Sequence, residues 1–185
     1  MNAIAYFLNN TRYCYTLKLF KLLYFLDFEH YRQAGRSVTG LAYRALPKGP
    51  VPADLYDEIK NYTKKVEGEN APLGVREVAD DIGELDRREF MPQDEYDSTY
   101  FTPRELTIMK RLATIFGEDT ADAMIAHSHD PKLPWQKVYK TGEGKGDAIS
   151  YDLALESTPI VEQVPTIDKD ELIILKDVFR GTGLQ

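Results

Sequence analysis

The run Ser128-His129-Asp130 carries the three side-chain types of a serine-hydrolase triad, but its spacing argues against one. Adjacent residues on a helix do not face one another, and a triad is assembled from separated chain positions. His127 and His129 are two positions apart rather than four, and Cys14 is the single cysteine, so no metal-binding pattern results. We interpret His129 as a buried or half-buried imidazole at a helix end, and we predict no catalytic residue and no metal ligand.

The glycine-rich segment of residues 141–146 resembles a phosphate loop only in composition. The spacing of that motif is absent, and Glu143 would repel a phosphate. We predict a mobile loop there, and no cofactor. Asp27 is different, because it interrupts an apolar run, and an unpartnered buried carboxylate would cost several kcal/mol. We therefore predict that a tyrosine hydroxyl, a basic residue, or N–H groups of the Gly49-Pro50-Val51 turn bind Asp27.

The stretch that must position these side chains runs from Thr16 to Gly35, TLKLFKLLYFLDFEHYRQAG. Thr16 can cap a helix and Gly35 can end it in a left-handed conformation. Apolar residues occupy nearly every side, which places this helix in the middle of a core. Charged residues interrupt the run, so it is too short for a membrane span.

The polar residues of this helix divide into two sets. Glu29 and His30 lie beside Asp27 but point elsewhere, so no acid–base pair forms with it. Lys18 and Lys21 share another face with Glu29 and Arg32, and this face is predicted to be a solvated stripe.

The rest of the chain predicts a predominantly helical α+β fold, a single compact domain around the buried helix with short strands or a hairpin. We expect residues 1–156 to form this domain, and residues 157–185 an extended segment and a helix that pack on it or bind a partner. Helices are predicted at residues 2–9, 53–65 with Pro52 at their start, 103–116 after a Thr102–Glu105 capping box, 120–128, from 134, and 169–180. Strands are predicted at residues 38–45 with a bulge at Gly40, near 75–78 and 89–91, and at 148–151.

Composition indicates an ordinary globular protein of 185 residues, with 43% hydrophobic residues and a net charge of −7. Its single cysteine suits a reducing cytoplasm. Charge is uneven: residues 1–66 carry +5, residues 67–101 carry −8, and the remainder −4. The acidic middle argues against nucleic-acid binding and suits a partner with a basic face, unless these charges only solvate a loop-rich hairpin.

Several motifs occur in an order that resembles the Panacea domain of SocA-like, phage-associated antitoxins. They are the run from Lys18 to Asp27, the segment from Gly35 to Gly40, and the Gly-Pro-Val-Pro turn with Leu55-Tyr56, followed by the Ser-His element with Trp135 and by the Ile149-Ser-Tyr run. The resemblance covers residues 3–156. The signature residues, which we interpret as fold determinants, are Lys18, Lys21, Tyr24, Asp27, Gly49, Pro50, Pro52, Tyr56, Ser128, His129 and Trp135.

The resemblance implies a non-enzymatic antitoxin of a bacterial toxin–antitoxin system. Its relatives neutralise unrelated toxins, some of them alarmone-synthetase-like enzymes that modify tRNA, generally by direct binding to a toxin encoded next to them. One relative is a proteolytic adaptor that delivers its toxin to the ClpXP protease. The implied partner is therefore a cognate toxin, in a hetero-oligomer, with no membrane and no nucleic acid; the toxin-binding residues are not indicated.

Two other classes of function remain as alternatives. A hydrolase or nuclease would use Asp27, His30 or His129, and these would have to converge in one pocket. A DNA-binding regulator would need a basic surface, and the helix-turn-helix that some relatives carry is not recognisable here. The segment from Thr158 onward is either a last core helix or a partner-binding arm.

Overall fold

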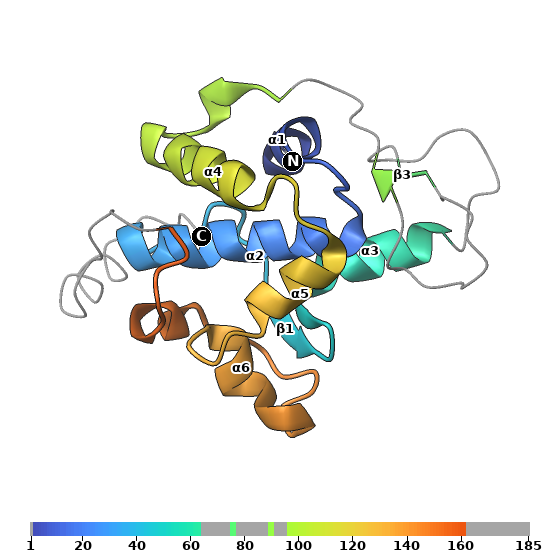
Figure 1. The fold of residues 1–185 in the computed structure, drawn as a ribbon, viewed down its shortest axis with the longest axis vertical. Coiled ribbons are helices and arrows are strands. Elements are labelled where there is room, and N and C mark those ends of the chain that lie inside the picture. Colours follow the sequence, from blue (N-terminus) through green and yellow to red (C-terminus); the bar gives the residue numbers. More distant parts are fainter. Residues whose placement is uncertain (1, 64–74, 77–88, 91–95, 162–185) are drawn as a thin grey trace.

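The computed structural model describes residues 2–63, 75–76, 89–90 and 96–161. Helix α2 (Thr16–Ala34) runs through the middle, and the other elements surround it (Figure 1). Every residue of α2 except Ala34 is buried. The predicted helical α+β fold around a central helix is therefore confirmed.

The two ends of α2 differ in how well they were predicted. Gly35 is left-handed with φ 69°, and its N–H donates to the carbonyl of Tyr31, as expected. The capping prediction for Thr16 is wrong, because Tyr15 is the N-cap residue and Thr16 is already helical and buried. A left-handed turn at Tyr13, with φ 52°, brings the chain into the helix one residue earlier.

The strands β1 (Tyr43–Leu46) and β2 (Gly49–Pro52) form an antiparallel hairpin in which Tyr43 pairs with Pro52. The predicted strand over residues 38–45 is wrong in its first half, since residues 38–42 form a loop that includes Gly40 at φ 72°. In that loop the N–H groups of Val38 and Thr39 donate to the buried carboxylate of Asp27 instead of to a neighbouring strand. Pro52 ends β2, so it does not open helix α3 (Ala53–Thr63).

Helices α1 (Asn2–Asn10), α4 (Pro103–Phe116) and α5 (Ala121–Ser128) pack against α2, and α6 (Pro134–Tyr139) contacts the hairpin. The capping box is confirmed: the Thr102 hydroxyl accepts from the N–H of Glu105, whose carboxylate accepts from the N–H of Thr102. Thr120 caps α5 through its side chain. These starts were predictable because caps are local signals.

The remaining elements are short. Strands β3 (Val75–Arg76) and β4 (Glu89–Phe90) pair antiparallel, at both predicted places. The predicted strand at residues 148–151 shrinks to one bridge between Arg44 and Ala148, and the chain then enters the 3-10 helix η4 (Tyr151–Glu156). The predicted helix at residues 169–180, and most of the extended stretch before it, lie outside the described residues.

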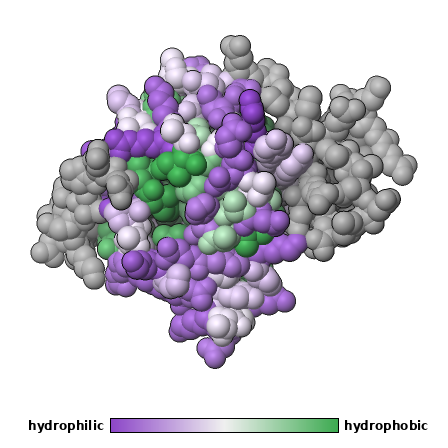
Figure 2. Space-filling view, in the orientation of Figure 1, coloured by the Kyte–Doolittle hydropathy of each residue, from purple (hydrophilic) through white to green (hydrophobic). Residues whose placement is uncertain are grey.

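The surface is mostly hydrophilic on the face shown in Figure 2, and hydrophobic residues gather over the middle of α2 beside α4. In the part of the chain that the structure describes, no helix is long and apolar enough to cross a membrane.

Candidate functional site

The polar residues of α2 lie in the protein interior, so the predicted solvated stripe is wrong. Lys18 and Lys21 are both 0% exposed, and Glu29 and Arg32 are 1% and 4% exposed. The lysines donate to backbone carbonyls that other segments bring to the helix, while Glu29 and Arg32 pair with each other. Packing therefore surrounds α2 on its polar faces as well as on its apolar ones.

Lys18 joins the start of α2 to the connection between α4 and α5. Its ammonium donates to three carbonyl oxygens, those of Arg12 at 2.6 Å, Gly117 at 2.8 Å and Asp119 at 2.8 Å. Burial lowers the pKa of Lys18, and nearby acidic groups act in the opposite direction. The lysine thus satisfies carbonyls that the helix ends leave without a partner in their own helices.

Lys21 lies where α2, β2 and α5 meet. Its Nζ donates to the carbonyl of Pro50 at 3.1 Å. A Cβ on Gly49, whose φ is +102°, would lie 2.6 Å from both Lys21 Cε and Ser128 Oγ. The buried Ser128 hydroxyl donates to the Ile125 carbonyl of its own helix at 2.8 Å. Gly49 is therefore required for its backbone conformation and for this close approach.

His129 follows α5 and stacks on Trp135, with ring centroids 3.9 Å apart, and Trp135 stacks in turn on Tyr139 at 4.6 Å. The indole N–H of Trp135 donates to the Leu46 carbonyl, and its backbone N–H donates to the Tyr24 hydroxyl. Burial, with a smaller effect of the Lys21 ammonium, lowers the pKa of His129. The prediction of a half-buried imidazole at a helix end is confirmed.

Asp27 binds the loop that follows α2. Its carboxylate accepts from the N–H groups of Val38 at 2.8 Å and Thr39 at 2.7 Å, from the Thr39 hydroxyl, and from the Tyr43 hydroxyl at 2.7 Å. The tyrosine partner was predicted, but the backbone donors come from residues 38–39 instead of the 49–51 turn. Burial raises the pKa of Asp27, and the four donated hydrogen bonds oppose this effect.

The neighbours of Asp27 along the helix have separate partners, as predicted. Glu29 accepts from Arg32, from Gln33, and from the N–H of Ile160 at 3.1 Å. The Nδ1–H of His30 donates to the Arg36 carbonyl, and its Nε2 lies 3.8 Å from the Glu105 carboxylate. Burial lowers the pKa of His30. These contacts join the second half of α2 to α4 and to the chain after η4.

The arrangement fixes elements in place and does not assemble a reaction centre from these groups. Ser128 bonds within α5, Asp27 bonds the 38–39 loop and β1, and His129 stacks on α6. Pro52 pairs in the hairpin, and the Tyr56 ring packs against Phe20 with centroids 6.3 Å apart. Within residues 2–63, 75–76, 89–90 and 96–161, no three His, Cys, Asp or Glu side chains are placed to hold a metal ion.

Some residues that hold these elements together, which we call the frame, were not predicted from the sequence. Tyr31 donates to the Asp152 carboxylate across 121 positions, and Tyr151 donates to the Leu41 carbonyl across 110. No local pattern signals such pairs. Thr39 carries only a weak signal: threonine often bonds nearby backbone groups, as its hydroxyl does with the N–H of Leu41, but its bonds to Asp27 span 12 positions.

Comparison with known proteins identifies the family of the chain. The family model described as "Antitoxin SocA-like, Panacea domain" matches residues 19–136, from the first turn of α2 into α6. Comparison with curated proteins gave no match, and comparison with solved structures gave none either. The matched region contains all the predicted signature residues except Lys18, which immediately precedes it. The chain therefore belongs to the SocA-like antitoxin family and contains its Panacea domain.

Proposed function

We propose that the protein neutralises a cognate toxin by binding it directly. The observation that carries this proposal is the antitoxin-family match over residues 19–136. The proposal includes a cytoplasmic, non-enzymatic role in a toxin–antitoxin pair, a hetero-oligomer with a toxin encoded next to it, and an antitoxin domain formed by residues 1–156.

The internal bonding of the frame supports a binding role. Ser128, Asp27 and Lys21, which could otherwise carry chemistry, contact other parts of the same chain and are fully buried. What the protein offers a partner is therefore its outer surface. A stable complex needs a contact of about 1,600 Å² in total, to which exposed large side chains such as Tyr100 contribute strongly.

The test is coexpression with the product of the neighbouring gene, with growth rescue and the mass of the purified complex as readouts. Direct binding predicts rescue together with a stable heteromeric complex. Rescue without a complex, lost in a host that lacks ClpXP, would replace direct binding by delivery to the protease. If neither rescue nor a complex is found, the antitoxin proposal is contradicted for this pair.

The non-enzymatic part of the proposal has its own test. The change Ser128→Ala removes the candidate nucleophile and one hydrogen bond inside α5, so we expect full neutralisation by the variant. Thr114→Ala, which removes an exposed hydroxyl that bonds a carbonyl of its own helix α4, is the matched control. Loss of rescue in Ser128→Ala with an unchanged circular dichroism spectrum would favour a hydrolase instead.

A further inference from the structure

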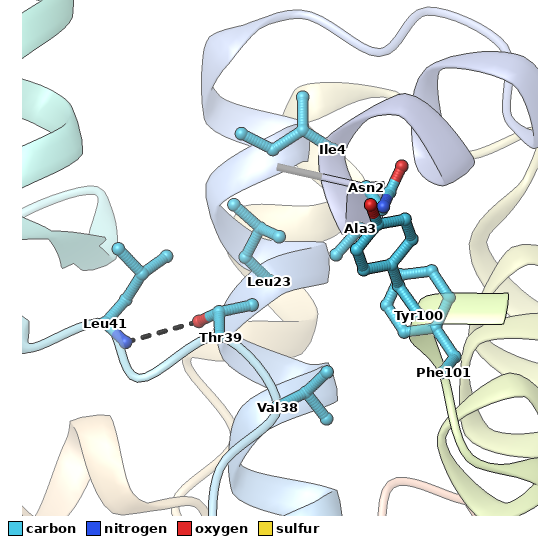
Figure 3. A pocket seen from close by; sticks show the side chains of 9 residues that line it. All are labelled: Asn2, Ala3, Ile4, Leu23, Val38, Thr39, Leu41, Tyr100 and Phe101. Carbon is cyan, nitrogen blue, oxygen red and sulfur yellow. Dashed lines mark hydrogen bonds between the residues drawn. The ribbon is translucent and has the colours of Figure 1, made fainter. Parts of the chain in front are cut away.

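A pocket of about 310 Å³ opens between α1, the loop after α2, and the segment before α4 (Figure 3). Leu23 of α2 lies at this pocket, with Ile4 from α1, Val38 and Leu41 from the loop, and Phe101 from the segment before α4. Its lining is mainly apolar. Four segments, α1, α2, the loop after α2 and the stretch before α4, therefore combine to form one apolar depression at the surface.

The wall of the pocket is fixed by the bonds described above. Asp27 accepts from the N–H groups of Val38 and Thr39, and the Thr39 hydroxyl accepts from the N–H of Leu41 (Figure 3). Ile4 and Leu23 are 6% and 0% exposed and belong to the core. The pocket is thus preformed, which lowers the entropic cost of binding.

Tyr100 lies at this pocket and is 74% exposed, more than any other large hydrophobic side chain among the described residues. It ends the 3-10 helix η2 (Ser98–Tyr100), whose other residues are exposed too. Core packing does not explain an aromatic side chain at this position. Exposed tyrosines beside apolar pockets are typical of protein–protein contacts.

An acidic side chain, Asp97, precedes the short helix that Tyr100 ends. Asp97 is exposed, its N–H donates to the Asn2 side chain at the pocket, and its carboxylate accepts from Thr99. Residues 89–101 contain four acidic residues and no lysine or arginine. Arg36, two residues before Val38 of the lining, pairs with Glu105 at 3.2 Å, so part of its charge is balanced within the protein.

We propose that this pocket binds the toxin, and that it takes an apolar side chain from a segment of the toxin that also carries Lys or Arg. The apolar lining and Tyr100 receive the apolar side chain. Asp97, which bonds Asn2 of the lining, attracts the basic residues beside it. This inference rests on the proposed antitoxin function and assigns it a surface.

The experiment compares the affinity of purified variants for the product of the neighbouring gene. Tyr100→Ser removes the exposed ring, and Asp97→Lys reverses the rim charge. Ile115→Ser, an exposed apolar residue of α4 that does not line the pocket, is the matched control. We expect Tyr100→Ser and Asp97→Lys each to weaken binding about tenfold or more, and the control to leave it unchanged.

Salt provides a second readout, because wild-type affinity should fall as ionic strength rises and Asp97→Lys should reduce that dependence. Circular dichroism verifies that the exposed-site variants fold. If the wild type binds and both pocket variants bind equally well, the pocket assignment is overturned while the antitoxin function stands. If Tyr100→Ser weakens binding but salt and Asp97→Lys do not, the basic character of the partner segment is overturned. If the wild type does not bind, the proposed function itself fails.

Discussion

Removing the Asp27 carboxylate should destabilise the protein through the loop that it holds. The change Asp27→Ala leaves the N–H groups of Val38 and Thr39 without their acceptor. The hydroxyls of Thr39 and Tyr43 can rotate toward other acceptors, so the loss of the carboxylate costs less free energy at these two groups. Asp27→Asn is the matched variant, because it has nearly the same shape and keeps one oxygen for the two N–H groups.

The expected magnitudes follow from these contacts. Each N–H group left unsatisfied costs about 1–3 kcal/mol, so Asp27→Ala should lower the free energy of unfolding by about 2–6 kcal/mol. In Asp27→Asn the amide can donate to both hydroxyls after they turn, so this variant should lie within about 1 kcal/mol of the wild type. A domain of ordinary stability has only about 5–15 kcal/mol, so Asp27→Ala should be strongly affected.

Urea unfolding measures both effects. Trp135 is the single tryptophan and is 2% exposed, so its fluorescence reports unfolding, with circular dichroism as an independent probe. If Asp27→Asn costs as much as Asp27→Ala, the reasoning about rotating hydroxyls is refuted. If Asp27→Ala costs less than about 1 kcal/mol, the carboxylate does not hold the loop as the geometry indicates.

The same pair of proteins tests the protonation of Asp27. Because the folded pKa is raised, the folded protein retains a proton that the unfolded chain releases above about pH 3.9. The stability that Asp27 contributes should therefore fall as pH rises from there through the folded pKa. Asp27→Asn lacks this dependence, so the stability difference should move in favour of the variant with rising pH. A constant difference between acidic and neutral pH would contradict the raised pKa.

Three further predictions concern the frame. Gly49→Ala should lower the free energy of unfolding, measured in urea, by more than about 2 kcal/mol. Gly40 is also left-handed but has open space where a Cβ would lie, so Gly40→Ala should lower it only by the backbone strain of about 1 kcal/mol. Equal costs would mean that close packing at Gly49 is unimportant. Lys18→Met should lower the free energy of unfolding by about 3–5 kcal/mol, because three carbonyls lose a charged donor. Thermal or urea unfolding measures this, and an unchanged stability would show that water replaces the ammonium. The pKa of His129 is lowered in the folded state, so stability should fall as pH drops below about 6.5, and His129→Gln should weaken that fall; an unchanged pH profile in the variant would contradict the shift.

The sequence was sufficient to predict what local patterns encode. The central helix could be found because apolar residues occupy all its sides, and Gly35 and the Thr102 capping box set boundaries through their nearest neighbours. The need for a partner at Asp27 also followed from the cost of burying a carboxylate. In each case the physical cause lies within a few residues or in the residue itself.

Two of the errors share a cause, which is contact between distant segments or redirection of hydrogen bonds to a residue outside the local pattern. Lys18 was assigned to a solvated stripe because lysine is usually exposed, but its acceptors at Gly117 and Asp119 are 99 and 101 positions away. Residues 38–42 contain strand-forming side chains, yet their N–H groups go to Asp27 and not to a neighbouring strand. The pocket near Tyr100 could not be foreseen, because four separate segments line it.

The burial of α2 on all its faces has a consequence for synthesis of the chain. This helix leaves the ribosome well before Ile160, which donates to Glu29 from 131 positions further along the chain. At about 5–20 residues per second, the apolar helix waits on the order of ten seconds before its last described neighbour exists. During that interval its hydrophobic faces are open to chaperones, proteases and other nascent chains. The supply of active protein therefore depends on how the cell protects an unfinished chain, as well as on the stability of the finished one.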